Sequence, residues 1–156
     1  MPFPEVGDVA PDFETQTDTG EPIKLSDFRG ETIVLYFYPK ADTPGCTKQA
    51  CAYRDNYDAF AERGVKVLGI SYDTVEEQAA FKQKFALPFT LLADPDAAIA
   101  EQYGLWRERT FERNGKSRTV HFVERSTLII DADGKVKFSA RGVDPTTDTQ
   151  AVLDKL

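Results

Sequence analysis

The chain has 156 residues, of which 41% are hydrophobic and 29% are charged, and its 26 acidic and 19 basic residues give a net charge of -7. This length suits one domain, residues 1–156, and the negative charge without a Lys/Arg block argues against nucleic acid or a membrane surface as a partner. The N-terminus lacks the basic and apolar segments of a signal peptide and no apolar run is long enough to span a bilayer, so we expect a soluble, cytoplasmic protein.

The predicted elements alternate between strands and helices through the first two thirds of the chain. A short hairpin is expected at 13–25, a buried strand at 32–38 and a helix from Pro44 toward Gly64. The following elements are a strand at 65–73, a helix at 74–87 that Thr74 caps, a strand at 88–94 and a helix ending at Gly104.

The last third is predicted to form a hairpin and a closing helix. Residues 104–119 resemble a charged connection, whereas the strands at 119–131 and 135–140 are joined by Asp133-Gly134, a strong hairpin signal. A helix is expected at 144–156. Parallel strands with helical crossovers, then a hairpin and a helix, predict an α/β thioredoxin-like fold: a central mixed β-sheet flanked by helices, with an N-terminal β-hairpin.

Both cysteines, Cys46 and Cys51, fall in the helix predicted after the first buried strand. Thr43 can cap the free N–H groups of this helix and Pro44 suits its first position, so Cys46 lies in the first turn. The unpaired N–H groups and the positive end of the helix dipole favour a thiolate there. Because Gly45 leaves room for a small molecule, we expect Cys46 to be exposed and reactive.

The spacing of the two cysteines predicts a conformational change. In an ideal helix, five residues separate two Cα atoms by roughly 8.7 Å, which is beyond the limit of about 7 Å for a disulfide. If Cys46 and Cys51 pair, the first turns of the helix must therefore unwind.

The two cysteines also fit other classes of protein. The pair could be two small buried hydrophobic residues, but in a reducing cytosol a close thiol pair is more often redox-active or metal-binding. Two cysteines and the distant His121 do not supply four metal ligands, so we expect no metal and no cofactor. A thioredoxin-like disulfide oxidoreductase would share the fold but normally uses C-x-x-C. A binding module without catalysis would not explain the residues gathered at the helix start.

The segment "PKADTPGC" fits the peroxiredoxin active-site pattern through Pro39, Thr43 and Cys46. With Cys51 added, "FYPKADTPGCTKQACAYRDNY" resembles the bacterioferritin comigratory protein, or peroxiredoxin Q, subfamily, and the similarity extends over nearly the whole chain. This resemblance implies a thiol peroxidase for hydrogen peroxide and organic hydroperoxides, in which Cys46 attacks the peroxide and Cys51 resolves the sulfenic acid as an intramolecular disulfide. It also implies recycling by thioredoxin or a similar dithiol, and a monomer.

The resemblance further implies that Arg125, in "VERSTLIID", is the active-site arginine. Thr43 can hydrogen-bond the peroxide, Pro39 can shield the sulfur from water, and Arg125 can stabilise the thiolate and the transition state. Strand alternation would place Arg125 on the face of Val123 and Thr127, where an ion pair with an acidic residue would satisfy it equally well. The arginines at 107, 109, 113 and 118 are expected to be solvated.

Overall fold

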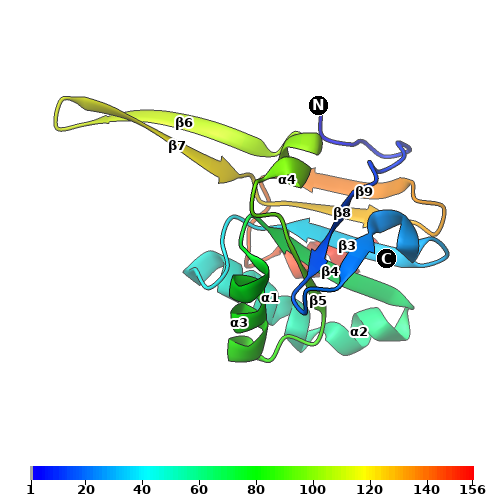
Figure 1. The fold of residues 1–156 in the computed structure, drawn as a ribbon. Helices are drawn as coiled ribbons and strands as arrows, with labels where there is room; N and C mark the ends of the chain where they lie inside the picture. The colour runs from blue at the N-terminus through cyan, green and yellow to red at the C-terminus, as the bar shows by residue number, and fades with distance from the viewer. Residues whose placement is uncertain (1) are drawn as a thin grey trace.

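The structure, a computed structural model, describes residues 2–156, and its centre is a seven-stranded mixed sheet (Figure 1). The strand order is β2-β1-β5-β4-β3-β8-β9. Their bounds are β1 Glu14–Thr17, β2 Pro22–Lys24, β3 Thr32–Phe37, β4 Val65–Ser71, β5 Thr90–Ala93, β8 Ser126–Ile130 and β9 Val136–Arg141. The mixed sheet and the N-terminal hairpin of β1 and β2 confirm the predicted architecture.

The three central strands are parallel because helices connect them. β3 pairs with β4 from Thr32 opposite Val65 to Phe37 opposite Ile70, and β4 continues the pairing to β5. On the other side of β3, the antiparallel β8 and β9 form the hairpin predicted from Asp133-Gly134, where Gly134 has the positive φ of 83° that such a turn requires.

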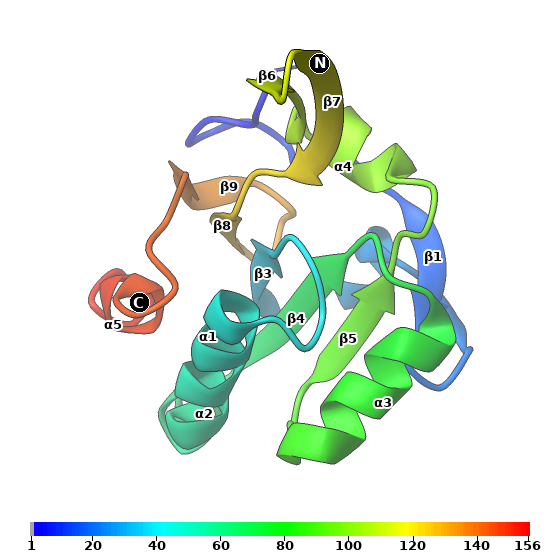
Figure 2. The same cartoon turned by 90° about the vertical axis from the view of Figure 1, so that its left-hand side faces the viewer.

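Helices cover both faces of the sheet (Figures 1 and 2). The bounds are η1 Leu25–Phe28, α1 Pro44–Asp55, α2 Tyr57–Glu62, α3 Val75–Phe85, α4 Ala98–Gln102 and α5 Asp148–Leu153. Side chains of α1, α2, α3 and α5 join the apolar core on one face, and those of α4 and the N-terminal segment join the core on the other. Both faces of β3 are therefore buried, which its continuous apolar sequence predicted.

Two of the predicted helices can be compared with their sequence signals, one at its start and one along its length. Thr74 caps α3 by accepting from the N–H of Glu77, as expected, and the Glu77 side chain completes a capping box. The helix expected to run from Pro44 toward Gly64 is instead interrupted at Asn56, whose φ and ψ of -107° and 11° are not helical, and it continues as α2.

The main departure from the prediction is a second, separate hairpin. Residues 104–119 are not a plain connection, because β6 Trp106–Arg113 pairs with β7 Lys116–Val123. Asn114 and Gly115 both have positive φ, 55° and 73°, as the two-residue turn of a tight hairpin requires. The single strand expected at 119–131 is consequently split at Glu124 and Arg125, which lie between β7 and β8.

Candidate active site

The loop from β3 to α1 brings the candidate residues to the start of α1. Pro44 occupies the first turn and Thr43 precedes it with the extended backbone of an N-cap residue. The Thr43 hydroxyl, however, does not cap the helix: it donates a hydrogen bond to the carbonyl of Lys40 at 2.7 Å. The predicted side-chain cap is therefore wrong. Since its proton is engaged, the hydroxyl oxygen is left to accept a hydrogen bond from a ligand.

Cys46 is buried rather than exposed, with 1% of its surface accessible. The first turn of α1 packs on the sheet, and Cys46 belongs to the same apolar cluster as Tyr36, Tyr38 and Ala50. The expectation of an exposed thiol was wrong because helix position alone does not show which face of the helix the sheet covers. A bulky thiol therefore has little direct access to this sulfur in the reduced form.

Arg125 reaches Cys46 from the segment between β7 and β8. Its Nη2 donates to the Cys46 Sγ at 3.4 Å and its Nη1 donates to the Gln49 Oε1 at 2.7 Å. A Cβ atom at Gly45 would lie 3.1 Å from the same Nη2, so the glycine permits this close approach. The strand-face placement expected for Arg125 is wrong, and its partner is the thiol together with an amide rather than a carboxylate.

A buried polar chain continues from Arg125 to α5. Gln49, which is fully buried, donates its amide to the Asp148 carboxylate at 2.9 Å, and the hydroxyls of Tyr53 and Thr127 donate to the same carboxylate oxygen at 2.7 and 3.0 Å. Burial and then the nearby Asp148 carboxylate raise the pKa of Tyr53 well above its ordinary value, so its hydroxyl stays a donor.

Sequence reasoning missed Gln49 and Asp148. Gln49 lies three residues after Cys46 and Tyr53 seven residues after it, which places all three along one face of α1. That spacing was a usable signal for Gln49. No comparable signal existed for Asp148, which is 99 residues away in the chain.

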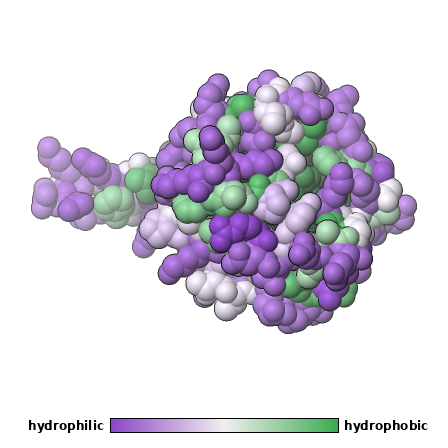
Figure 3. Space-filling model, turned by 90° about the horizontal axis from the view of Figure 1, so that it is seen from below, coloured by the Kyte–Doolittle hydropathy of each residue, from purple (hydrophilic) through white to green (hydrophobic). Residues whose placement is uncertain are grey.

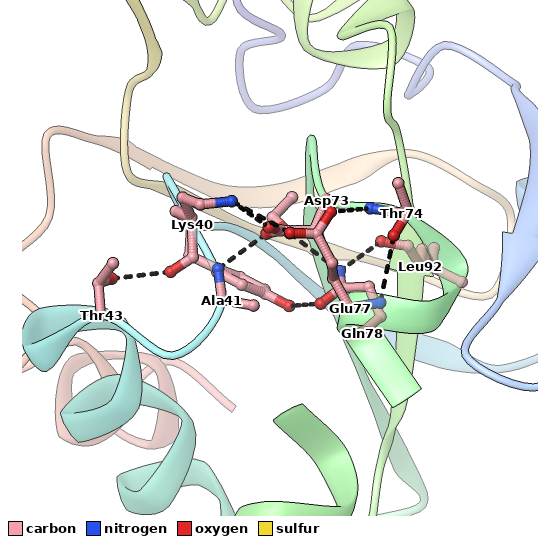
Figure 4. A network of polar contacts seen from close by, with 10 residues as sticks. Lys40, Ala41, Thr43, Asp73, Thr74, Glu77, Gln78 and Leu92 are labelled. Carbon is pink, nitrogen blue, oxygen red and sulfur yellow. Dashed lines mark hydrogen bonds and ion pairs between the residues drawn. The ribbon is translucent and has the colours of Figure 1, made fainter. Parts of the chain in front are cut away.

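The loop that carries Pro39 and Thr43 is held by Asp73, two residues after the end of β4 (Figure 4). The Asp73 carboxylate accepts from the backbone N–H of Ala41 at 2.7 Å and from the Lys40 Nζ at 2.9 Å. The hydrogen bond to Asp73 is the main cause that raises the pKa of Lys40, although the lysine side chain is 46% accessible. Pro39 itself is half-buried in this loop.

A second layer of contacts supports Asp73 and the loop. The Gln78 amide, from α3, donates to the Ser71 hydroxyl at 3.0 Å and to the Leu92 carbonyl at 2.7 Å, while the Tyr38 hydroxyl donates to Gln78 (Figure 4). Ser71 in turn donates to Asp73. The loop before α1 is thus connected to β4, β5 and α3 by buried hydrogen bonds, which restrict its motion.

Cys51 shares α1 with Cys46, and both thiols are free. Cys51 is half-buried. The prediction that one helix carries both cysteines is therefore confirmed, and helix geometry predicts that they cannot pair while α1 is intact. His121 lies in β7 and stacks on Trp106 with 5.5 Å between ring centroids. Within residues 2–156, no cluster of three or more His, Cys, Asp or Glu side chains could hold a metal ion, and no helix is long and apolar enough to cross a membrane.

The sequence is also similar to those of known proteins. Residues 6–139 match the AhpC/TSA family. The putative peroxiredoxin bcp of Coxiella burnetii is 47% identical over 132 residues, which cover 85% of this chain and 85% of that protein.

Solved structures of related proteins have a similar fold. The peroxidoxin BcpB of Mycobacterium tuberculosis has a TM-score of 0.84 and 36% identity, covering 97% of this chain and 96% of that one. The bacterioferritin comigratory protein of Xanthomonas campestris, studied for its alkyl peroxide reduction activity, has a TM-score of 0.83 and 30% identity, covering 91% and 88% of the two chains. These similarities confirm the predicted thioredoxin-like fold.

Proposed function

Because the chain belongs to the AhpC/TSA family, and within it to the bacterioferritin comigratory protein or peroxiredoxin Q subfamily of thiol peroxidases, we propose that Cys46 attacks the peroxide and Cys51 resolves the product. The observation that carries these assignments is the 3.4 Å contact from Arg125 to the Cys46 sulfur at the start of α1. The alternative of a disulfide oxidoreductase is not supported by the relatives, which are peroxiredoxins.

In the first step the Cys46 thiolate attacks one oxygen of the hydroperoxide. The S–O bond forms as the O–O bond breaks, the sulfur is oxidised to a sulfenic acid, and the other oxygen leaves as water or an alcohol after it takes a proton. Arg125 faces the sulfur and stabilises the charge spread along the S–O–O line, while the Thr43 hydroxyl oxygen can accept a hydrogen bond from the peroxide. Pro39 keeps water from the sulfur.

In the second step the Cys51 thiol attacks the sulfenic sulfur, the S–S bond forms and water leaves. Since both residues lie in α1, this step follows unwinding of its first turns, which also carries Cys46 out of its buried position. A dithiol then reduces the disulfide by exchange. We propose thioredoxin or a similar protein as that dithiol, because the exposed disulfide of an unwound segment is accessible to a protein.

We further propose organic hydroperoxides beside hydrogen peroxide as substrates, since the Xanthomonas campestris relative reduces alkyl peroxides. Residues 1–156 are proposed to form one domain. We propose that the enzyme is cytoplasmic, because the cytoplasm would supply the reducing dithiol. All the proposed catalytic residues come from one chain, so we propose the monomer as the catalytic unit, which is sufficient for turnover whether or not copies associate.

The assignments are tested by the masses of the protein and its variants after one equivalent of hydrogen peroxide. The parent should lose two hydrogens as the disulfide, Cys51→Ser should gain one oxygen on Cys46, and Cys46→Ser should neither change nor consume peroxide. A Cys46→Ser variant that retains turnover would refute the assignment of the nucleophile, and disulfide-linked dimers of the parent would refute the intramolecular second step.

A further inference from the structure

The β6–β7 hairpin has two chemically different faces. Residues directly opposite one another in an antiparallel pair point to the same side, and successive residues alternate. One side, which we call the basic hairpin face, carries all five cations of the hairpin and three apolar residues: Arg107, Arg109, Phe111, Arg113, Lys116, Arg118, Val120 and Phe122. The two acidic residues, Glu108 and Glu112, lie on the other side.

Apart from Arg107, the basic hairpin face has no cover within the described chain. Residues 108–122 are all exposed, and the hairpin projects away from the body of the molecule (Figures 1 and 3). Four of its cations, all except Arg107, form no ion pair within residues 2–156. Phe111, Val120 and Phe122 are 38%, 43% and 36% accessible and are three of the five large apolar side chains exposed on that part of the chain. A two-stranded hairpin is marginal without a partner, and exposed aromatic and arginine side chains together are typical of protein interfaces.

The remainder of the chain has the opposite charge. The hairpin, residues 106–123, holds five basic and two acidic residues, which leaves 14 basic and 24 acidic residues elsewhere. The charge is therefore separated within one molecule: a positive arm extends from a strongly negative body. A negative body disfavours the approach of nucleic acid to the arm and favours the arm of another copy.

One part of the body matches the arm in both charge and apolar character. Two adjoining hollows of about 290 and 360 Å³ lie between β1, the start of α3 and the segment before α4, and they share Gln16, Val75 and Pro95. We call this region the acidic groove; Glu14, Glu76 and Asp96 line it, and Val75, Pro95 and Ala98 give it apolar surface. The exposed carboxylates of Glu14, Glu76 and Asp96 are in no ion pair within residues 2–156.

We propose that the basic hairpin face of one copy docks into the acidic groove of a second copy of this chain. Phe111, Val120 and Phe122 would cover the apolar surface of the groove, and the unpaired arginines would meet its carboxylates. The association is reversible and dependent on salt, because its charges lie at exposed positions. It adds to the proposed function without depending on it, since neither surface contains a proposed catalytic residue.

The first test measures the mass of the parent chain in solution by sedimentation equilibrium, from micromolar to millimolar protein. The protein should associate at about 0.1 M salt, where the Debye length is roughly 10 Å, and dissociate at about 1 M salt, where it is roughly 3 Å. A monomer throughout the concentration range at the lower salt would overturn the proposal.

The second test exchanges the charges. Arg109→Glu with Arg118→Glu replaces two cations of the basic hairpin face by carboxylates, and Glu14→Lys with Glu76→Lys replaces two carboxylates of the groove by cations. Each double variant alone should bind itself roughly 10-fold or more weakly than the parent binds itself, because like charges then face each other. A mixture of the two double variants should associate as the parent does, because each arm then meets a groove of opposite charge.

The matched control is Lys137→Glu with Lys155→Glu, which reverses two exposed charges outside both surfaces and should leave association unchanged. If the mixture of the two double variants stays monomeric although both fold, the pairing of hairpin and groove is wrong. If the parent protein bound a nucleic acid probe through its hairpin and did not associate with a second copy, the proposal would also be overturned. Peroxide reduction by each variant reports separately on the proposed function.

Discussion

At the scale of single residues, the contact of Arg125 with Cys46 invites the most direct measurement. Arg125→Ala removes the donor at 3.4 Å from the sulfur, and we expect the rate constant for reaction with peroxide to fall about 10²- to 10³-fold, as for loss of one transition-state donor. Stopped-flow loss of free thiol measures this rate. Arg113→Ala, on the exposed hairpin, is the matched control and should react at the parent rate. If Arg125→Ala folds normally and reacts equally fast, Arg125 has only a structural role.

Asp148 acts on the same arginine through Gln49. In Asp148→Asn the three donors that converge on one carboxylate oxygen lose a charged acceptor, so we expect a loss of about 1–3 kcal/mol in the free energy of unfolding. Gln49 is then free to turn, and Arg125 is held less firmly, so the peroxide reaction should slow by less than in Arg125→Ala.

The neighbouring residue supplies the control for Asp148. Thr149 is equally buried in α5, but its hydroxyl has no hydrogen-bond partner within the described residues. Thr149→Ala should therefore leave the peroxide reaction unchanged. Equal slowing in Asp148→Asn and Thr149→Ala would show that α5 affects the site only through general packing.

At the scale of elements, the proposed disulfide requires α1 to exist in two states. Forming the Cys46–Cys51 disulfide exchanges helical hydrogen bonds of residues 44–51 for a loop, so the oxidised protein should show a weaker helical circular dichroism signal and faster amide exchange there. β3 and β8 should stay protected in both states. Cys51→Ser, oxidised once, should keep its helix because no disulfide forms. Unchanged exchange in oxidised parent protein would contradict the two-state description.

The contacts of α1 suggest how far this unwinding extends. Its first two turns contribute Cys46 to the core and Gln49 to the chain of hydrogen bonds. Tyr53, in the next turn, donates to Asp148 and stacks on Tyr36 with 4.6 Å between ring centroids. The part beyond Tyr53 has no cysteine. We therefore expect protection to persist at the end of α1 and through α2 while the first turns open.

At the scale of the whole molecule, two tyrosines of one core differ in how their hydroxyls are satisfied. Tyr36 is fully buried, and its hydroxyl has no partner within the described residues, whereas the Tyr53 hydroxyl donates to Asp148. Tyr36→Phe removes an unsatisfied polar group and should raise the free energy of unfolding by about 1 kcal/mol. Tyr53→Phe should lower it by about 1.5–3 kcal/mol, because it removes a hydrogen bond to a charged group.

Denaturant titration of the two variants measures both effects under the same conditions. The substitutions are chemically identical and lie in stacked rings, so each serves as the control for the other. A loss of stability in Tyr36→Phe as large as that in Tyr53→Phe would mean that the Tyr36 hydroxyl is satisfied in solution.

The sequence alone was sufficient for the features that depend on neighbours in the chain. Pro44 at the first turn, the five-residue spacing of the cysteines, the cap by Thr74 and the Asp133-Gly134 turn all act over a few residues. Asn114-Gly115 is the same kind of hairpin turn signal as Asp133-Gly134. It did not lead to a predicted hairpin, because the charged residues around it suggested a solvated connection rather than two strands exposed on both faces.

Only the tertiary structure decided the environment of the thiol. Burial of Cys46 depends on which face of α1 packs on the sheet, and the approach of Arg125 joins positions 79 residues apart through the break between β7 and β8. Asp148 reaches Gln49 only because α5 packs beside α1. Periodicity and turn signals report the local backbone. These contacts instead follow from how distant elements bury their apolar faces together, and no fixed spacing in the sequence indicates that arrangement.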